Sequence, residues 1–193
     1  MIKATLKKWL IIFLITLSPT LSLAAVPSWT IVPDQSKLNF TVTQNGAPVS
    51  GEFKKFTGVI VFDPTQLSAS HIVIVVDMNS VFDSYQKISD TLKTADFFDV
   101  SLFPQATFKS TQIIKTGDDT YQAIGTLSLR DKNLALTLNF SQQEYSATHA
   151  KMIGSTTISR TAFGVGQGQW ADTDTIKDAV QVNFIINATR MNP

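Results

Sequence analysis

Two histidines and two neighbouring aspartates are the side chains that could support metal or acid–base chemistry in this chain. His71 and His149 lie 78 positions apart, and no His-x-x-x-His spacing or cysteine accompanies them. The sequence therefore predicts no metal site. Asp96 and Asp99 flank two phenylalanines and could form an acid–base pair, although helix capping and turn formation are commoner uses of aspartate. The interpretation is that the chain has no catalytic residue and is not an enzyme.

Two other sequence patterns also give no sign of a catalytic or phosphate-binding site. The chain lacks the Gly-x-Ser-x-Gly turn of serine hydrolases. The GVGQG run at 164–168 could suggest a phosphate-binding loop, but the following QWADTDT does not favour the helix that such a loop requires. We interpret the run as a connection between strands. A lipid-acting hydrolase or isomerase that uses Asp96, Asp99 or His149 remains an alternative hypothesis.

Large apolar side chains gather between Asp90 and Thr111, in DTLKTADFFDVSLFPQATFKST. They are Leu92, Phe97, Phe98, Leu102, Phe103 and Phe108. Helical spacing of apolar residues predicts a short helix within 84–95, and Pro104 stops any helix before it. Side chains of this size on a connection must be covered by the protein's core or by an apolar ligand. We expect residues 84–104 to pack across one side or end of the fold.

The N-terminus predicts export. Three lysines precede the nine-residue apolar run Trp9–Leu17, and Pro19 and a Ser22-Leu23-Ala24 cleavage site follow. An uncleaved anchor would need about 20 apolar residues. We therefore expect a signal peptide over 1–24, a single domain over 25–193, and a periplasmic or secreted location. Removing residues 1–24 leaves thirteen basic against fifteen acidic residues, a net charge of −2 that argues against nucleic-acid binding.

Alternating apolar and polar residues predict strands over most of residues 25–193. In 132–141, for example, Leu134, Leu136, Leu138 and Phe140 share one face, and 37–44 and 179–190 alternate in the same way. Asn45-Gly46 is a strong hairpin signal. Residues 49–63 are expected to form one long strand region, bent at Gly51 and Gly58. The class is all-β, as a sandwich or a barrel, with one short helical connection.

The chain resembles the YceI-like family over the whole of residues 25–193. The similarity rests on DTLKTADFFDVSLFPQATFKST, on GTLSLRDKNLALTLNF, on SKLNFTVTQNGAPVSGEFKKFTGVIVFDP, and on an Arg-x-x-Phe-Gly run that begins at Arg160. The resemblance implies an extended, lipocalin-like antiparallel β-barrel of about eight strands. It also implies an apolar pore for an amphiphile with an isoprenoid or acyl tail, and it implies a homodimer as a frequent assembly.

Two departures from the family pattern concern the head group of a ligand. Gln35-Ser36-Lys37 and Gln44-Asn45-Gly46 stand where many members carry histidines, and Ile88-Ser89 stands in place of an Arg-Asp pair. Head-group contacts therefore cannot be transferred from the family. The Gln-Asn-Gly variant resembles a branch that accompanies a membrane b-type cytochrome, which would favour a quinone.

These observations lead to a hypothesis of function: non-catalytic binding or transport of a polyisoprenoid or quinone, with no other cofactor. The alternatives are a closed core filled by the same phenylalanines and a stress-response protein that binds a protein partner. The predicted pore residues are Phe40, Val42, Phe53, Ile74, Val76, Leu92, Phe97, Phe98, Phe103, Phe108, Leu136, Leu138, Phe140, Phe163 and Phe184.

Overall fold

A computed structural model describes residues 25–191 of the chain, which form eleven strands and one α-helix, α1 (Gln86–Lys93). The predicted signal peptide over 1–24 lies outside the described residues. The strands are β1 (Ser28–Ile31), β2 (Lys37–Gln44), β3 (Ala47–Phe53), β4 (Phe56–Val61), β5 (His71–Asp77), β6 (Val81–Phe82), β7 (Gln105–Lys115), β8 (Thr120–Leu129), β9 (Lys132–Tyr145), β10 (His149–Ser159) and β11 (Ile176–Arg190). No helix in this part of the chain is long and apolar enough to cross a membrane.

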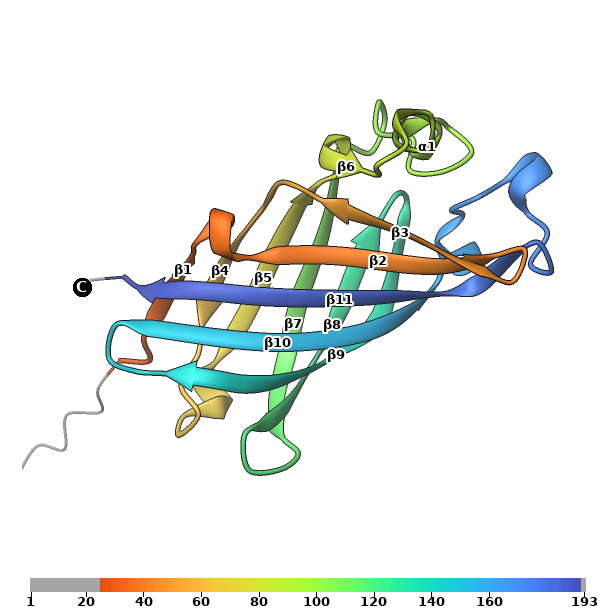
Figure 1. The fold of residues 1–193 in the computed structure, drawn as a ribbon. Coiled ribbons are helices and arrows are strands. Elements are labelled where there is room, and N and C mark those ends of the chain that lie inside the picture. The colour runs from red at the N-terminus through yellow and green to blue at the C-terminus, as the bar shows by residue number, and fades with distance from the viewer. Residues whose placement is uncertain (1–24, 192–193) are drawn as a thin grey trace, which may run out of the picture.

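The strands form one antiparallel sheet that closes on itself (Figure 1). The ring runs β1-β4-β5-β7-β8-β9-β10-β11 and is closed by pairing of β1 with β11, so eight strands make the barrel. Strand β11 is long enough to pair with β1 through residues 188–190 and with β2 through residues 176–185. The predicted all-β, eight-stranded antiparallel barrel with one short helical connection is confirmed.

The hairpin between β2 and β3 follows from its two turn residues. Asn45 and Gly46 adopt φ values of +49° and +78°. Two successive positive φ angles twist the chain in the sense that matches the flanking strands, and asparagine and glycine tolerate them best. The turn sets the register in which Gln44 pairs with Ala47. The hairpin predicted from Asn-Gly is therefore present.

The region 49–63 differs from its prediction. It contains two strands, β3 and β4, and the break falls at Lys54-Lys55, not at a glycine. Gly51 and Gly58 lie within the strands, where they leave space for inward-facing side chains. A Cβ on Gly51 would lie 2.5 Å from the Phe40 ring, and one on Gly58 would lie 2.6 Å from Ile74. Glycine at these two positions leaves room for a side chain of the neighbouring strand, and the local sequence does not reveal this requirement.

Aromatic side chains close one end of the barrel, near β1 and the β9–β10 hairpin. Trp29, Phe62, Tyr121 and Phe140 are buried, and Tyr145 is half-buried beside them. The Phe62 ring lies 5.4 Å from Tyr121 and 5.9 Å from Phe140, between centroids. The Trp29 indole and the Tyr145 hydroxyl both donate to the Phe62 carbonyl, at 2.9 and 3.2 Å. We call these five residues the aromatic plug.

The burial of Tyr145 in the aromatic plug leads to a prediction about the stability of the protein at alkaline pH. Burial, reinforced by the charge of Asp63, raises the pKa of Tyr145 from 10.0 to about 12. The neutral phenol therefore favours the folded state fully below pH 10, and this contribution is lost as the pH rises towards 12. We expect Tyr145→Phe to reduce the loss of unfolding free energy between pH 10 and 12 in denaturant titrations. Tyr85→Phe is the control because that side chain is 72% exposed, and an equal effect there would contradict the prediction.

Candidate functional site

The barrel encloses a cavity of about 230 Å³. Its wall comes from the inward faces of most of the strands and from α1 and the loop after it. At the end opposite the aromatic plug, Met78, Leu92, Phe97, Phe98 and Val165 surround it. Its middle is lined by alternate residues of β9 and β11, including Leu136, Val182 and Phe184. The wall is almost entirely hydrophobic.

The inward face of β11 shows that side chains do not fill the barrel. Val180, Val182, Phe184 and Ile186 point inward, yet each is only half-buried. Side chains in a closed core would be almost fully buried, because protein interiors are packed as densely as organic crystals. The exposed area of these residues faces the cavity. Of the two alternatives open from the sequence, the structure therefore has a hollow barrel and not a solid core.

Residues 84–104, which we call the lid, cover the open end of the barrel (Figure 1). Leu92 from α1, Phe97 and Phe98 reach the cavity wall. The Phe98 ring lies 5.6 Å from Phe53 of β3, and its backbone N–H donates to the Leu92 carbonyl at 3.0 Å. Asp99 adopts a φ of +47°, which turns the chain back after the two phenylalanines. The large apolar side chains of the lid are thus shielded from water by the barrel, because they point into its cavity.

Two loops of the barrel hold the lid in place. Arg130, in the turn between β8 and β9, donates to the carbonyls of Ala95 and Phe97. From the β10–β11 connection, the N–H groups of Gly166 and Gln167 donate to the Asp96 carbonyl at 2.7 and 2.8 Å. These contacts use the lid's backbone, so its position depends on few of its side chains. The GVGQG run is a connection between strands, as its sequence indicates.

Arg160 organises that connection and lies on the cavity wall. Only 4% of the residue is exposed, and its hydrogen bonds with the described residues all go to backbone carbonyls. Nη1 donates to Val165 and Gly166 at 3.0 and 3.1 Å, and Nη2 donates to Asp172 and Ile176 at 3.2 and 2.8 Å. A Cβ on Gly166 would overlap Nη1, so glycine is required there. The guanidinium therefore holds the β10–β11 connection in its folded shape.

Most of the predicted pore residues lie on the cavity wall. They are Phe40, Val42, Phe53, Ile74, Val76, Leu92, Phe97, Phe98, Phe108, Leu136, Leu138 and Phe184. Phe140 lines a second, smaller cavity nearer the aromatic plug. Binding of a ligand by these residues stays a prediction.

Two predicted residues lie elsewhere. Phe103 is off the cavity wall, and its ring faces the Arg130 guanidinium at 5.6 Å. Phe163 is buried in the core but is not on the wall either, because it belongs to a short 3₁₀ turn, η4 (Thr161–Phe163), outside the barrel strands. Phe163 is buried and Phe103 is half-buried, but neither side chain is covered by the cavity. The direction in which a loop side chain points has no sequence period and could not be predicted.

The sequence interpretation missed several wall residues, among them Phe56, Met78, Leu127 and Arg160. Leu127 follows the alternation of β8 and could have been included on that basis. Met78 and Arg160 immediately follow strands, where no alternation applies. Arg160 is the least expected, because a buried arginine needs partners that only the folded loop supplies.

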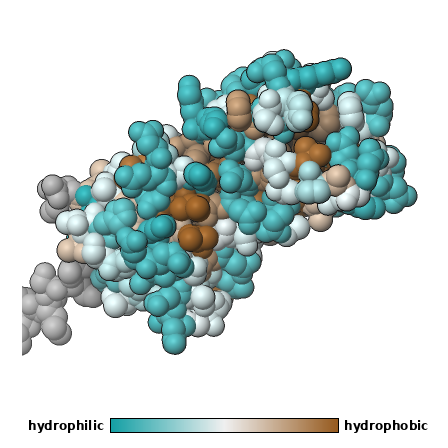
Figure 2. Space-filling model, viewed as in Figure 1, coloured by the Kyte–Doolittle hydropathy of each residue, from teal (hydrophilic) through white to brown (hydrophobic). Residues whose placement is uncertain are grey.

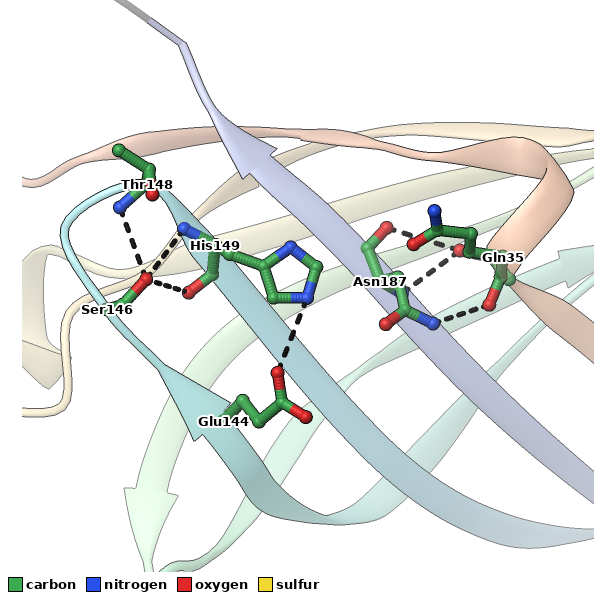
Figure 3. A network of polar contacts seen from close by, with 7 residues as sticks. Gln35, Glu144, Ser146, Thr148, His149 and Asn187 are labelled. Atoms are coloured by element: carbon green, nitrogen blue, oxygen red, sulfur yellow. Dashed lines mark hydrogen bonds and ion pairs between the residues drawn. The ribbon is translucent and has the colours of Figure 1, made fainter.

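Two of the candidate acid–base residues, His149 and Asp99, make contacts with other residues nearby in the sequence. The His149 Nε2 faces the Glu144 carboxylate at 3.6 Å, and the Ser146 hydroxyl contacts backbone atoms of Thr148 and His149 instead of the imidazole (Figure 3). The Asp99 carboxylate accepts from the Ser101 hydroxyl at 2.9 Å, which is a turn contact. His71 is exposed on the outer face of β5, as expected.

Residues 25–191 bring no three His, Cys, Asp or Glu side chains close enough together to hold a metal ion. The Gln35-Ser36 pair, which departs from the family pattern, also has a structural role. The Ser36 hydroxyl accepts from the Asn187 N–H at 3.0 Å, and the Asn187 side chain donates to the Gln35 carbonyl (Figure 3). These bonds tie the junction of β1 and β2 to β11, away from the cavity wall.

Comparison with known proteins identifies the family. The model of the YceI-like domain matches residues 29–188, which is nearly the whole barrel. The chain belongs to the YceI-like family. A UPF0312 protein of Vibrio cholerae is 28% identical over 155 residues, which cover 76% of this chain and 82% of the relative.

Solved structures share the fold. The crystal structure of Burkholderia cenocepacia BcnA matches with a TM-score of 0.78 and 31% identity, over 82% of this chain and 99% of BcnA. A polyisoprenoid-binding domain from Saccharophagus degradans matches with a TM-score of 0.70 and 17% identity, over 86% of this chain and 99% of that domain. The extended barrel described here therefore recurs in solved structures.

Proposed function

We propose that this protein binds an amphiphilic lipid with an isoprenoid-type tail, a polyisoprenoid or a quinone, and carries it without chemical change. The observation that supports this most is the hydrophobic cavity inside the barrel. Each CH₂-sized group moved from water into such a cavity contributes about 0.8 kcal/mol. A tail of several isoprene units then offsets the cost of association without a charged anchor.

Two of the three polar residues on the wall, Thr156 and Arg160, fit this proposal because their side chains are already bonded within the protein, and the third, Asn39, is exposed. The Thr156 hydroxyl donates to the Thr137 carbonyl at 2.9 Å, and the Arg160 guanidinium is bonded to backbone carbonyls. Neither side chain therefore needs a polar group of the ligand as a partner deep in the cavity. The tail would lie within the barrel and the head group would lie near the lid. The polyisoprenoid-binding domain from Saccharophagus degradans, which shares the fold, agrees with such a ligand.

The proposal predicts that binding depends on the tail and hardly on salt. We expect removal of one isoprene unit from a prenol or quinone probe whose whole tail fits in the main cavity to weaken binding at least tenfold, because each lost CH₂-sized group forfeits burial. Raising the ionic strength from about 0.05 to 0.5 M should change the dissociation constant less than about twofold, because few charged contacts would be screened. Fluorescence or calorimetric titration of delipidated protein measures both effects.

Native mass spectrometry of the gently purified protein tests the proposal against its alternatives. Co-purified lipid of unchanged mass supports the carrier. Turnover of an added lipid would identify an enzyme, and a bare chain bound to another protein would favour the partner-binding hypothesis. Affinity that ignored tail length and collapsed with salt would also contradict the proposal, since it would indicate a charged head-group site.

The proposed setting is the periplasm or the exterior of the cell, on the basis of the predicted signal peptide. Detection of the chain beginning after Ala24 in a periplasmic extract would support this location. A homodimer and a membrane b-type cytochrome partner stay predictions from the family resemblance. The outer surface seen in Figure 2 is mostly hydrophilic, with small hydrophobic areas, one of them over β10 and β11, where Ile153 and Ile185 pair across the strands.

A further inference from the structure

The barrel contains a second hydrophobic cavity, of about 60 Å³, between the main cavity and the aromatic plug. Trp29, Phe62 and Phe140 of the plug line it, together with the small residues Ala150 and Ala188. It is too small for an isoprenoid chain of its own, and it has no polar side chain on its wall that would hold ordered water. An extra apolar space at the blind end of a pore could extend the pore if nothing separated the two.

Three side chains separate the two cavities, because they line both. They are Leu138 of β9 and Phe184 and Ile186 of β11. Phe184 is the largest of the three, and only it carries a flat ring. The two cavities are therefore neighbouring parts of one apolar channel, and this constriction divides them.

The position of the Phe184 ring is set by Gly154. Gly154 of β10 pairs with Phe184 on one side and with Phe140 on the other. A Cβ on Gly154 would overlap the Phe184 ring and the Asn139 carbonyl oxygen, so only glycine fits beneath the ring. The ring lies against this bare stretch of backbone and is only half-buried, because part of it faces the channel. A glycine and a phenylalanine on adjacent strands thus fix the constriction.

We infer that Phe184, supported by Gly154, is the stop that sets how long a tail the protein accepts. The bound tail ends against the Phe184 ring, and the smaller cavity beyond it stays unused. This inference rests on the proposed function, because it assigns the length specificity of the same lipid site. The ligand class is an isoprenoid-type tail that fills the main cavity, and longer tails gain nothing from further units.

Prenols with increasing numbers of isoprene units are the probes for this inference. In the wild type, affinity should rise with each unit and then level off at a limiting length. In Phe184→Ala the two cavities join, so affinity should continue to rise for at least one further unit, by tenfold or more at that unit. Phe184→Leu keeps more of the packing and should shift the limit in the same direction by a smaller amount.

Two further variants control the experiment. Ile185→Ala changes the next residue of β11, which faces outward opposite Ile153, and should leave the limiting length unchanged. Ala150→Leu fills the smaller cavity and, added to Phe184→Ala, should move the limit back towards that of the wild type. Circular dichroism and thermal unfolding identify any variant that does not fold.

The outcomes separate this inference from the proposed function. A wild type whose affinity rises without limit along the series would overturn the stop, and so would Phe184 variants that keep the wild-type limit while binding shorter prenols normally. In both cases lipid binding itself would stand. Absence of binding to every prenol and quinone probe by the folded wild type would instead overturn the proposed function.

Discussion

Replacing Phe98 with aspartate should release the lid and abolish lipid retention. Phe98 is 9% exposed, lies on the cavity wall and packs against Phe53. A carboxylate at this position would have no partner in an apolar cavity, and burying it would cost several kcal/mol. Moving the lid outward would take this carboxylate to water, at the cost of the lid's backbone bonds to Arg130, Gly166 and Gln167. We expect at least tenfold weaker prenol binding and little co-purified lipid.

The matched control is Leu102→Asp, since Leu102 belongs to the same loop but is 71% exposed. This variant should retain lipid as the wild type does. Native mass spectrometry gives the lipid occupancy, and thermal unfolding reports whether the barrel itself is intact. A folded Phe98→Asp protein with wild-type occupancy would remove Phe98 from the binding site and would show that the lid is not needed for retention.

Replacing Arg160 with methionine should destabilise the protein by about 3–5 kcal/mol, because several carbonyls would lose a charged donor at once. The carbonyls of Val165, Gly166 and Ile176 are among them. Arg160→Lys should recover only part of the loss, because one ammonium cannot match the planar fork of donors. The unfolding free energy from urea titration measures both effects.

The control for this prediction is Arg190→Met, at an exposed arginine near the other end of the barrel. That substitution should change the free energy by less than about 0.5 kcal/mol, as is usual on the surface. A loss at Arg160 as small as at Arg190 would mean that the β10–β11 connection holds its shape without the guanidinium. Lipid retention should fall with Arg160→Met, since the same connection also holds the lid through Asp96.

The strands, and the inward face of most of them, could be predicted from the order of residues alone. Alternation along β2, β9 and β11 places Phe40, Leu136 and Phe184 inside because successive side chains on a strand point to opposite faces. The Asn45-Gly46 turn and the short helix in the lid were also predictable, since both depend on neighbouring residues alone. Local chemistry was enough wherever the structure repeats with a fixed period.

Tertiary structure decided everything that depends on segments far apart in the chain. Gly51, Gly58 and Gly154 looked like bends or gave no signal, yet each makes room for a side chain on an adjacent strand. Phe103 and Phe163 looked like pore residues, but their loops turn them away from the cavity. The role of Arg160 follows only from the folded β10–β11 connection, whose carbonyls surround the guanidinium.

Whether the barrel contains a cavity could likewise not be predicted from the sequence. The same phenylalanines could have filled a closed core, and composition does not distinguish the two arrangements. The barrel is hollow because the ring of eight strands is wider than the side chains of β11 can fill, so Val180 and Val182 stay half-buried around a cavity. The Phe184 ring lies between the main cavity and the smaller one, and the aromatic plug lines the smaller one. Both positions follow from packing between strands and not from any local pattern.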